Sequence, residues 1–358
     1  TGDYDYVWLA KHYNKMGNFP RIIGLTASPG SDLVTINEVS KNLFVEDVEV
    51  RTDKDEDLKP YVQETKIEYV LIDFPEDFKQ VQKYLTDCFK SKLRLLKEFN
   101  VLGAISMISK KKLLDTQREL QRRVARGERD QLIWQSIALV AESIKVQHAL
   151  ELLETQGVMA SMEYFKKLYS EAEVGKAKST KNLVQDVNFK SAYAKLNLMN
   201  ESNIEHPKLK RLLDIVKLEL KEGVKILIFN QYRDSANFLV NQLNELDNVK
   251  AKLFVGQMKK KGTGLTQKEQ IQIIQDFKDG VYNILVGTSV SEEGLDIPAV
   301  DLVLFYEPIP SAIRTVQRRG RTGRMSEGKV KILVTKGTRD EAYRWTAYHK
   351  ENRMHRIL

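Results

Sequence analysis

"VKILIFNQYRDSANFLVNQLNEL" occupies residues 224–246 and decides the fold of the second half of the chain. Residues 224–230 form a short apolar run, which is typical of a buried strand, and residues 233–246 carry apolar side chains at helical spacing. The alternation continues, with further strands predicted at 249–256, 282–288, 300–307 and 329–335 and a helix predicted over 265–280. Strands separated by crossover helices predict a parallel sheet, so the fold class is α/β.

The region from 76 to 205 has a different pattern. Apolar residues recur at helical spacing in 77–99, 132–157 and 161–172, and Gly157 is expected to end the second of these helices. Residues 174–182 are polar and are predicted to form a loop. The sequence therefore predicts an all-helical domain inserted between two α/β parts.

The first α/β part covers residues 1–75, and the second covers 206–358. In the first part, "RIIGLTASPG" (21–30) is predicted to form a buried strand that runs into a turn, and 66–74 is predicted to form another strand.

Composition restricts the function classes. The chain has 358 residues, 42% of them hydrophobic, and a net charge of +8. Cys88 is its only cysteine, which excludes an internal disulfide and a cysteine-based zinc site, and the five histidines show no metal-ligand spacing. No apolar run approaches the roughly 18 residues of a membrane helix. We expect no metal site, no membrane partner and an intracellular location, in the cytoplasm or nucleoid.

Basic residues concentrate in one stretch of the helical region. The stretch from Lys90 to Arg129 contains twelve Lys or Arg residues and only four Asp or Glu residues. A basic stripe of this kind is typical of a nucleic-acid footprint, and Lys110, Lys111 and Lys112 are its densest part. The alternative is a solvated helix face.

Polar clusters follow three of the predicted strands. They are "QYRDSA" (231–236), "GTSVSEEGLDIP" (287–298) and "VQRRGRTGR" (316–324). Ligands of parallel sheets bind at the carboxyl ends of the strands, so the three clusters should meet on one rim. In the last cluster, Arg321 and Arg324 are three residues apart and each follows a glycine. On a helical turn they would share a face that suits phosphate oxygens, although an Arg-rich loop can also be only solvated surface.

The order of these segments resembles a known family. "LTASPG", "ILIFNQYRDSA", "LFVGQ", "VGTSVSEEGLDIP" and "VQRRGRTGR" are similar to motifs three to six of superfamily-two helicases. The helical insert resembles that of the branch that contains archaeal Hef, the Fanconi anaemia M translocase, RIG-I-like receptors and Dicer. Within this branch, the residues of the last motifs are most similar to those of Hef and its Fanconi relative. The resemblance implies RecA-like parallel-sheet domains around the helical insert. Residues 1–75 would be the C-terminal part of the first domain, which is partial, and residues 206–358 would be the second.

The resemblance also implies roles for matching positions. ATP would be bound by Gly294 and Asp296, with Arg321 and Arg324 as arginine fingers and Gln317 as a sensor of the γ-phosphate. Nucleic acid would be contacted by Thr288, Ser289, Gln231, Arg233, Gly256 and Gln257. Thr26 and Ser28 would couple the ATP state to domain closure. Thr26 and Ser28 could instead cap a turn, and Thr288 could be a core residue.

Two motifs of the family do not occur in this sequence. No Gly-x-x-x-x-Gly-Lys-Ser/Thr segment is present, "VGKAKS" (174–179) has Ala after its Gly-Lys pair, and "RDEAY" (339–343) places an acidic box on the terminal helix. We therefore expect the Mg²⁺ ligands and the phosphate-binding lysine to lie outside this chain, in a missing N-terminal helicase segment. The chain alone should then hydrolyse no ATP.

Three functions are compatible with these residues. The first is an ATP-dependent DNA helicase or translocase region that remodels forks and junctions in DNA repair, with branched or duplex DNA as partner. The second is a double-stranded RNA helicase or sensor of the same branch. The third is a non-catalytic nucleic-acid-binding fragment.

Overall fold

A computed structural model describes residues 5–26, 33–50, 55, 65–103, 108–175, 177–257, 264–288, 297–322 and 328–357. The chain forms two compact units. The α/β unit comprises residues 1–71, 212–334 and 340–358, and the helical unit comprises residues 72–211 and 335–339. The chain therefore passes from one unit to the other more than once, and the short segment 335–339 belongs to the helical unit.

The α/β unit is built on a six-stranded sheet with the order β1-β6-β5-β2-β4-β3. Its strands are β1 (Thr65–Ile72), β2 (Ile226–Phe229), β3 (Ala251–Phe254), β4 (Ile284–Gly287), β5 (Leu302–Phe305) and β6 (Gly328–Thr335). Strands β6, β5, β2, β4 and β3 pair in parallel with their neighbours in this order, which confirms the predicted α/β fold class. Strands β2, β4 and β5, in the interior of the sheet, are fully buried, as expected for strands covered on both faces, whereas β3, at its edge, is partly buried.

Helices precede or follow these strands along the chain. They are α9 (Pro207–Glu219), α10 (Arg233–Leu243), α11 (Gln267–Lys278), α12 (Ala312–Arg319) and α13 (Arg339–Ile357), and the N-terminal segment adds α1 (Asp5–Met16) and α2 (Leu33–Asn42). Helix α11 begins at a capping box, in which Thr266 and Glu269 satisfy each other's backbone N–H groups. It ends before Gly280, as predicted, and packs Ile273, Ile274 and Phe277 onto the sheet.

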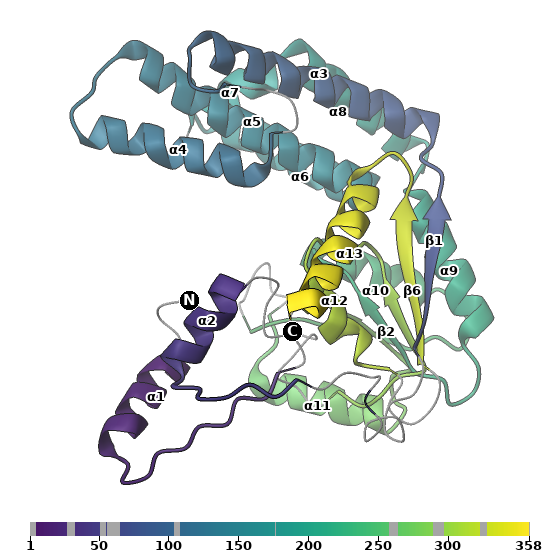
Figure 1. The fold of residues 1–358 in the computed structure, drawn as a ribbon. Coiled ribbons are helices and arrows are strands. Elements are labelled where there is room, and N and C mark those ends of the chain that lie inside the picture. Colours follow the sequence, from purple (N-terminus) through teal and green to yellow (C-terminus); the bar gives the residue numbers. More distant parts are fainter. Residues whose placement is uncertain are drawn as a thin grey trace. The chain divides into compact units, whose positions relative to one another are not determined.

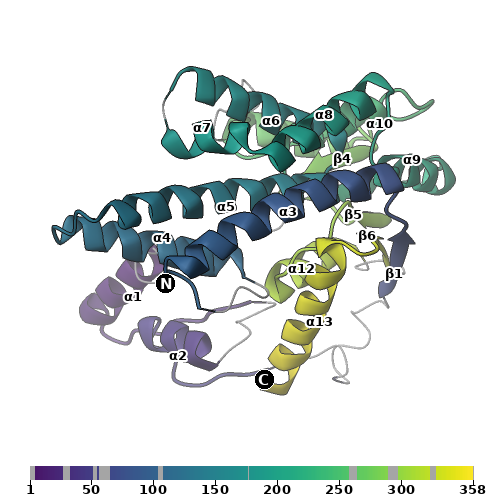
Figure 2. The ribbon, with the colours of Figure 1, turned by 90° about the horizontal axis from the view of Figure 1, so that it is seen from above.

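The helical unit contains the predicted insert. Its helices are α3 (Glu76–Glu98), α4 (Lys110–Ala125), α5 (Gln131–Thr155), α6 (Val158–Glu173), α7 (Lys178–Gln185) and α8 (Val187–Glu201). Figure 2 shows α3 and α5 side by side, and residues from both contribute to an apolar core that includes Phe78, Leu85 and Leu153. Asp130 and Asp186 cap the starts of α5 and α8 through their side chains.

Of the two strands predicted for the first part, one does not form, and the other forms but lies in a different sheet than expected. Residues 21–26 form no strand, and Ile23 and Leu25 are 86% and 93% exposed. A strand is stable only beside another strand, and none of the described strands pairs with this segment. The strand at 65–72 lies instead in the sheet of the C-terminal part, beside β6, and the arrows of β1 and β6 point the same way in Figure 1.

Ion pairs hold β1 at this edge. Lys331 of β6 lies 2.6 Å from a carboxylate oxygen of Glu68 on β1 and 3.3 Å from one of Glu219 on α9. Although burial works against the charge, these hydrogen bonds and charges raise the pKa of Lys331. The expected boundary at residue 75 therefore does not separate β1 from the second α/β part. The predicted loop 174–182 is also shorter than expected, because α7 begins at Lys178.

Gly157, which was expected to end α5, forms the turn between α5 and α6. Helix α5 ends at Thr155, two residues earlier. The φ of Gly157, 108°, lies in the left-handed region that favours glycine. The Glu205 carboxylate accepts hydrogen bonds from the backbone N–H groups of Val158 and Met159 at 2.7 and 3.1 Å. A carboxylate at this position satisfies free N–H groups at the start of α6 and complements the helix dipole.

Candidate nucleotide and nucleic-acid site

The carboxyl ends of four strands lie level with one another. Phe229 at the end of β2 is in register with Gly287 of β4 and with Phe305 of β5, and Phe254 of β3 is in register with Gly287. The residues that follow these strands therefore start from a common edge. This is the edge at which open parallel sheets bind their ligands.

The loop after β2 is fixed by neighbouring strands. The backbone N–H of Asn230 donates to Gly287 O at 2.9 Å, and that of Gln231 donates to Glu307 Oε1 at 2.5 Å. Glu307 is fully buried directly after β5. Its carboxylate thus sets the position of Gln231, one of the predicted nucleic-acid contacts.

The structure brings a second pair of predicted residues together. Arg233 Nη2 donates to the backbone O of Gly256 at 3.3 Å, which joins the start of α10 to the loop after β3. Gln257 is exposed beside Gly256. Thr288 is only 8% exposed, and its N–H donates to Phe254 O at 3.3 Å. Arg233, Gly256 and Gln257 therefore lie on the same rim. The burial of Thr288 also fits the alternative that it is a core residue.

The arginine segment differs from its prediction in one respect. Helix α12 carries Gln317 but ends at Arg319, and Gly320 follows as its C-cap with φ −64°. Arg321 therefore lies in the turn after the helix, and Arg324, with which it was expected to share a helical face, lies outside the described residues. Gly320 ends the helix by donating its N–H to Val316 O at 2.9 Å and does not need a left-handed conformation.

The turn after α12 is pinned to the segment that enters β5. Val300 N donates to Arg321 O at 3.1 Å, and Thr322 Oγ1 donates to Val300 O at 2.6 Å. Arg321 is 7% exposed. These bonds join the turn that carries Arg321 to the segment that enters β5.

Arg318 was missed by the sequence analysis. Its side chain is fully buried, and its guanidinium carbon lies 4.7 Å from the ring centre of Phe229 and 5.4 Å from that of Phe305. A guanidinium against two aromatic rings contributes cation–π attraction and anchors α12 on the strand ends. The sequence places Phe229 and Phe305 near the ends of two predicted strands. That they lie side by side, and so can accommodate Arg318, becomes apparent only from the pairing register of β2 and β5.

Several predicted residues cannot be placed. Ser28, Ser289, Gly294, Asp296 and Arg324 lie outside the described residues, and Thr26 is exposed. Their roles stay predictions, as does that of Gln317. Within the described ranges, no group of three or more His, Cys, Asp or Glu side chains could hold a metal ion.

The predicted basic stripe of the helical unit centres on α4. Lys110, Lys111 and Lys112 form its first turn, where no acidic residue compensates them. Cations at a helix N-terminus oppose the helix dipole, so this arrangement is not explained by helix stability. Lys110 Nζ lies 3.5 Å from Glu151, whereas Lys111 and Lys112 have no ion pair within the described part of the chain.

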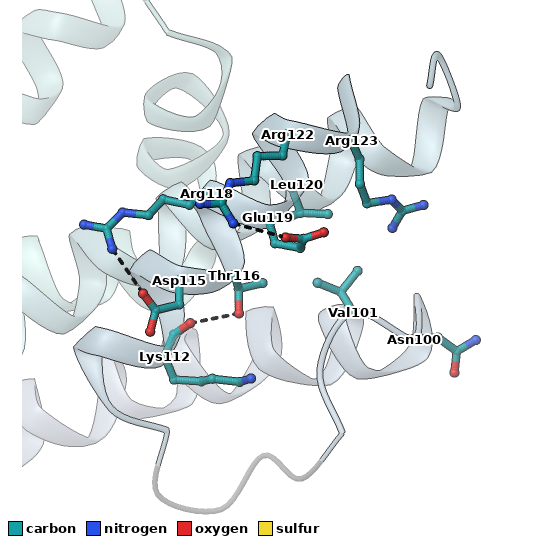
Figure 3. A pocket seen from close by; sticks show the side chains of 10 residues that line it. All are labelled: Asn100, Val101, Lys112, Asp115, Thr116, Arg118, Glu119, Leu120, Arg122 and Arg123. Carbon is teal, nitrogen blue, oxygen red and sulfur yellow. Dashed lines mark hydrogen bonds and ion pairs between the residues drawn. The ribbon is translucent and has the colours of Figure 1, made fainter. Parts of the chain in front are cut away.

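A groove of about 480 Å³ runs beside α4 (Figure 3). Arg118 and Arg122 line it but pair with Asp115 and Glu119, one helical turn away, at 3.2 and 3.8 Å. These are exposed pairs of the kind that contribute little to stability, so a phosphate can displace their carboxylates at low cost. The groove is thus basic, with its charge partly compensated.

One lysine of the stripe is not part of this surface. Lys92 Nζ lies inside the helical unit, 2.7 Å from Asp186 and 3.3 Å from Glu142. Burial opposes its charge, but the hydrogen bond to Asp186 and the charge of Glu142 raise the pKa of Lys92. The expected stripe is therefore wrong at this position, because Lys92 neutralises buried carboxylates.

Comparisons with known proteins agree with this architecture. The family model "Putative ATP-dependent RNA helicase, helical bundle" matches residues 77–203, and the helicase conserved C-terminal domain matches residues 207–326. The crystal structure of the Pyrococcus furiosus Hef helicase domain is 44% identical with a TM-score of 0.73, and the match covers 97% of this chain and 71% of that one. The chain belongs to the superfamily-two helicases of the Hef branch.

Curated relatives extend this family. "Putative ATP-dependent RNA helicase MJ1505" of Methanocaldococcus jannaschii is 42% identical over 361 residues, which cover 100% of this chain and 44% of the relative. "ATP-dependent DNA helicase MPH1" of Pyricularia oryzae is 32% identical over 358 residues, which cover 96% of this chain and 32% of the relative. This helicase chain thus spans less than half the length of both. None of its described helices is long and apolar enough to cross a membrane.

Proposed function

We propose that this chain is the motor region of an ATP-dependent DNA helicase or translocase that remodels branched DNA, such as forks and junctions, in DNA repair. One observation carries the proposal. The level strand ends hold Gln231, Arg233 and Gly256 on one rim, and α12, with its arginine segment, is anchored on the same strand ends through Arg318. A nucleic-acid rim and a nucleotide segment built on one sheet edge suit a motor that couples the two ligands.

ATP is the proposed cofactor, with Mg²⁺. Arg321 and Arg324, with Gln317, Gly294 and Asp296, would face the phosphates. Phosphoryl transfer depends mainly on positioning and charge stabilisation, and an arginine finger is typically worth about 10³- to 10⁵-fold in turnover. The bonds from Val300 to Arg321 and Thr322 support this assignment, because they fix the backbone of the arginine segment.

The helical unit would hold a duplex arm. The three lysines at the start of α4 provide the charge for phosphate contacts, and the N-terminus of a helix offers backbone N–H groups to phosphate oxygens. Because phosphate contacts are independent of base sequence, this surface would bind a duplex for its shape and charge.

Double-stranded RNA is the second candidate substrate. It is favoured by the names of one family model and of MJ1505, both of which refer to RNA helicases. DNA is favoured by the name of MPH1 and by the similarity of the last motifs to Hef. The two substrates share phosphates and differ in helix geometry, so a direct competition separates them.

The rim assignment is tested by binding of a fluorescently labelled DNA fork. Replacing Gln231 and Gln257 by Ala removes two exposed polar side chains from the rim. We expect about thirtyfold weaker binding, since each of the two hydrogen bonds contributes about 1 kcal/mol. The matched control replaces Gln272 and Gln275, which are exposed on α11, and should bind as the unaltered chain does. Equal affinity of both variants would exclude the rim as the nucleic-acid site.

A further inference from the structure

A second groove lies at the opposite edge of the sheet. Strands β2, β4 and β3 begin level, with Ile226 in register with Ile284 and Ala251 in register with Ile284. The three loops that precede these strands line a groove of about 930 Å³. This volume is within the usual range for ligand pockets, and the groove shares no residue with the rim at the carboxyl ends.

The floor of this groove is rigid. The side chain of Asn283 accepts from Lys250 N at 2.8 Å and donates to Asn248 O at 2.7 Å. Its backbone accepts from Ile226 N at 3.0 Å and donates to Lys250 O at 3.1 Å. One residue thus connects all three loops. A site held in this way loses little conformational entropy when a ligand binds.

Each loop also turns at a residue in the left-handed region. These residues are Gly223, Asn248 and Gly280, with φ of 80°, 61° and 79°. Above Gly223 and Gly280 the space is open, with no atom within 4 Å of the position that a Cβ would take. Because neither glycine carries a side chain and no other atom fills this space, the groove stays open at both turns.

The lining combines lysines with apolar surface. The lining has a net charge of two positive charges, because it contains four lysines and two carboxylates: Lys217, Lys221, Lys225, Lys250, Glu222 and Asp247. The apolar part of the lining is formed by Leu220, Val224, Leu246, Val249 and Tyr282. Within the described residues, no ion pair engages Lys217, Lys221 or Lys250, so their charges are available to a partner.

We propose that this groove binds an acidic segment of a partner protein, in which Asp or Glu residues alternate with apolar ones. The segment's carboxylates face the lysines, and its apolar side chains pack against Leu220 and Tyr282. Charge complementarity selects the partner, and the apolar floor adds affinity. A nucleic-acid strand fits less well, because its backbone carries a phosphate at every nucleotide and the apolar surface offers these phosphates no hydrogen bonds.

The test uses a fluorescein-labelled peptide of twelve residues in which Glu and Leu alternate. Binding to the 358-residue chain is followed by fluorescence anisotropy. We expect saturable binding that weakens with added salt and drops about tenfold in the double variant Lys221→Glu, Lys250→Glu. The control Lys268→Glu, Arg353→Glu makes the same charge change at exposed positions of the α/β unit and should bind within about twofold of the unaltered chain.

Further arms separate the alternatives. A peptide of alternating Lys and Leu should not bind, and one of alternating Glu and Ser should bind more weakly because it lacks the apolar side chains. Unfolding midpoints confirm that each variant folds, and Lys221→Gln with Lys250→Gln replaces the double variant if it does not. Absence of binding by the Glu-Leu peptide, equal loss in the control variant, or displacement of the peptide by a twelve-nucleotide DNA strand from the same groove would each overturn the proposal.

Discussion

Arg319 Nη1 lies 2.8 Å from Oε1 of Glu351 and 3.1 Å from Oε2, so one guanidinium nitrogen joins α12 to α13. Both side chains are largely buried, at 16% and 19% exposure. A charge pair that is mostly removed from water holds its geometry better than an exposed one. The C-terminal helix thus supports the helix that carries Gln317 and leads to Arg321.

Removing this pair should loosen the attachment of α13. For Glu351→Ala we expect a loss of about 1–2 kcal/mol in the free energy of unfolding, because Arg319 keeps its charge without a partner. The measurement is urea unfolding, combined with Arg319→Ala in a double-mutant cycle. Arg353→Ala, an exposed residue on the same helix, is the control and should change stability by less than about 0.5 kcal/mol. A zero coupling energy between Arg319 and Glu351 would contradict this account.

Gly157 should tolerate no side chain. A Cβ there would overlap the Glu205 carboxylate and come within 2.8 Å of His206 Cβ, in addition to the cost of a left-handed φ. We expect Gly157→Ala to lower the free energy of unfolding by about 2–4 kcal/mol. Gly127 is the matched control, because its φ is 96° but nothing lies within 4 Å of its Cβ position. Gly127→Ala should cost only about 1 kcal/mol, and equal losses for the two variants would contradict the packing explanation.

The stability of the chain should depend on the protonation of His206. Its Nδ1 accepts from Lys208 N at 3.2 Å and its Nε2 lies 3.2 Å from Glu154 O, an arrangement that suits the neutral ring. Burial and the Lys208 charge lower the pKa of His206 well below its ordinary value. The unfolded chain therefore takes up a proton first as the pH falls, and stability is lost below about pH 6.5 with a slope of up to about 1.4 kcal/mol per pH unit.

A His206→Gln variant isolates this effect. Burial raises the pKa of nearby Glu205, which acts in the opposite direction, since the folded chain then takes up that proton first. The difference between the unaltered chain and the variant removes this shared contribution. Urea unfolding from pH 7 to pH 5 should show a smaller loss of stability in the variant. Parallel curves would mean that His206 is not the responsible group.

Lys111 and Lys112 should contribute to duplex binding more than Lys110 does. All three are exposed, but Lys110 is paired with Glu151, whereas Lys111 and Lys112 have no ion pair within the described part of the chain. Replacing Lys111 and Lys112 by Ala should weaken duplex binding and reduce its salt dependence by up to about one unit of slope for each lost phosphate contact. Lys166→Ala with Lys167→Ala, which removes two charges from α6, should leave the slope unchanged. An unaltered slope in the first variant would assign α4 to solvated surface.

Local patterns were sufficient for much of the fold. The apolar runs at 224–230, 282–288 and 300–307 became β2, β4 and β5 because each is long enough for a central strand and is followed by a helix or a turn. Residues 21–26 did not form a strand, because strand formation depends on a neighbour and not only on apolar content. Residues 65–72 found that neighbour in β6, more than two hundred residues further along the chain, and no local pattern indicates such a pairing.

The candidate site was predictable at the level of segments. Gln231, Arg233 and Gly256 come together because they follow strands that end level. The pattern does not indicate which polar residues are buried, so Glu307 and Arg318 were missed and Lys92 was wrongly assigned to the surface. Glu307 is buried because it accepts a backbone hydrogen bond, and Arg318 because two strand-terminal phenylalanines accommodate its guanidinium.

Competition for a labelled DNA fork tests the central claim most directly. Unlabelled fork, linear DNA duplex and RNA duplex of equal length and matched sequence are each titrated against the complex of the labelled fork with the 358-residue chain. We predict that the fork displaces the label at a concentration at least about tenfold lower than either duplex, a difference of about 1.4 kcal/mol. Displacement by the RNA duplex at the same or a lower concentration would contradict a motor region for branched DNA.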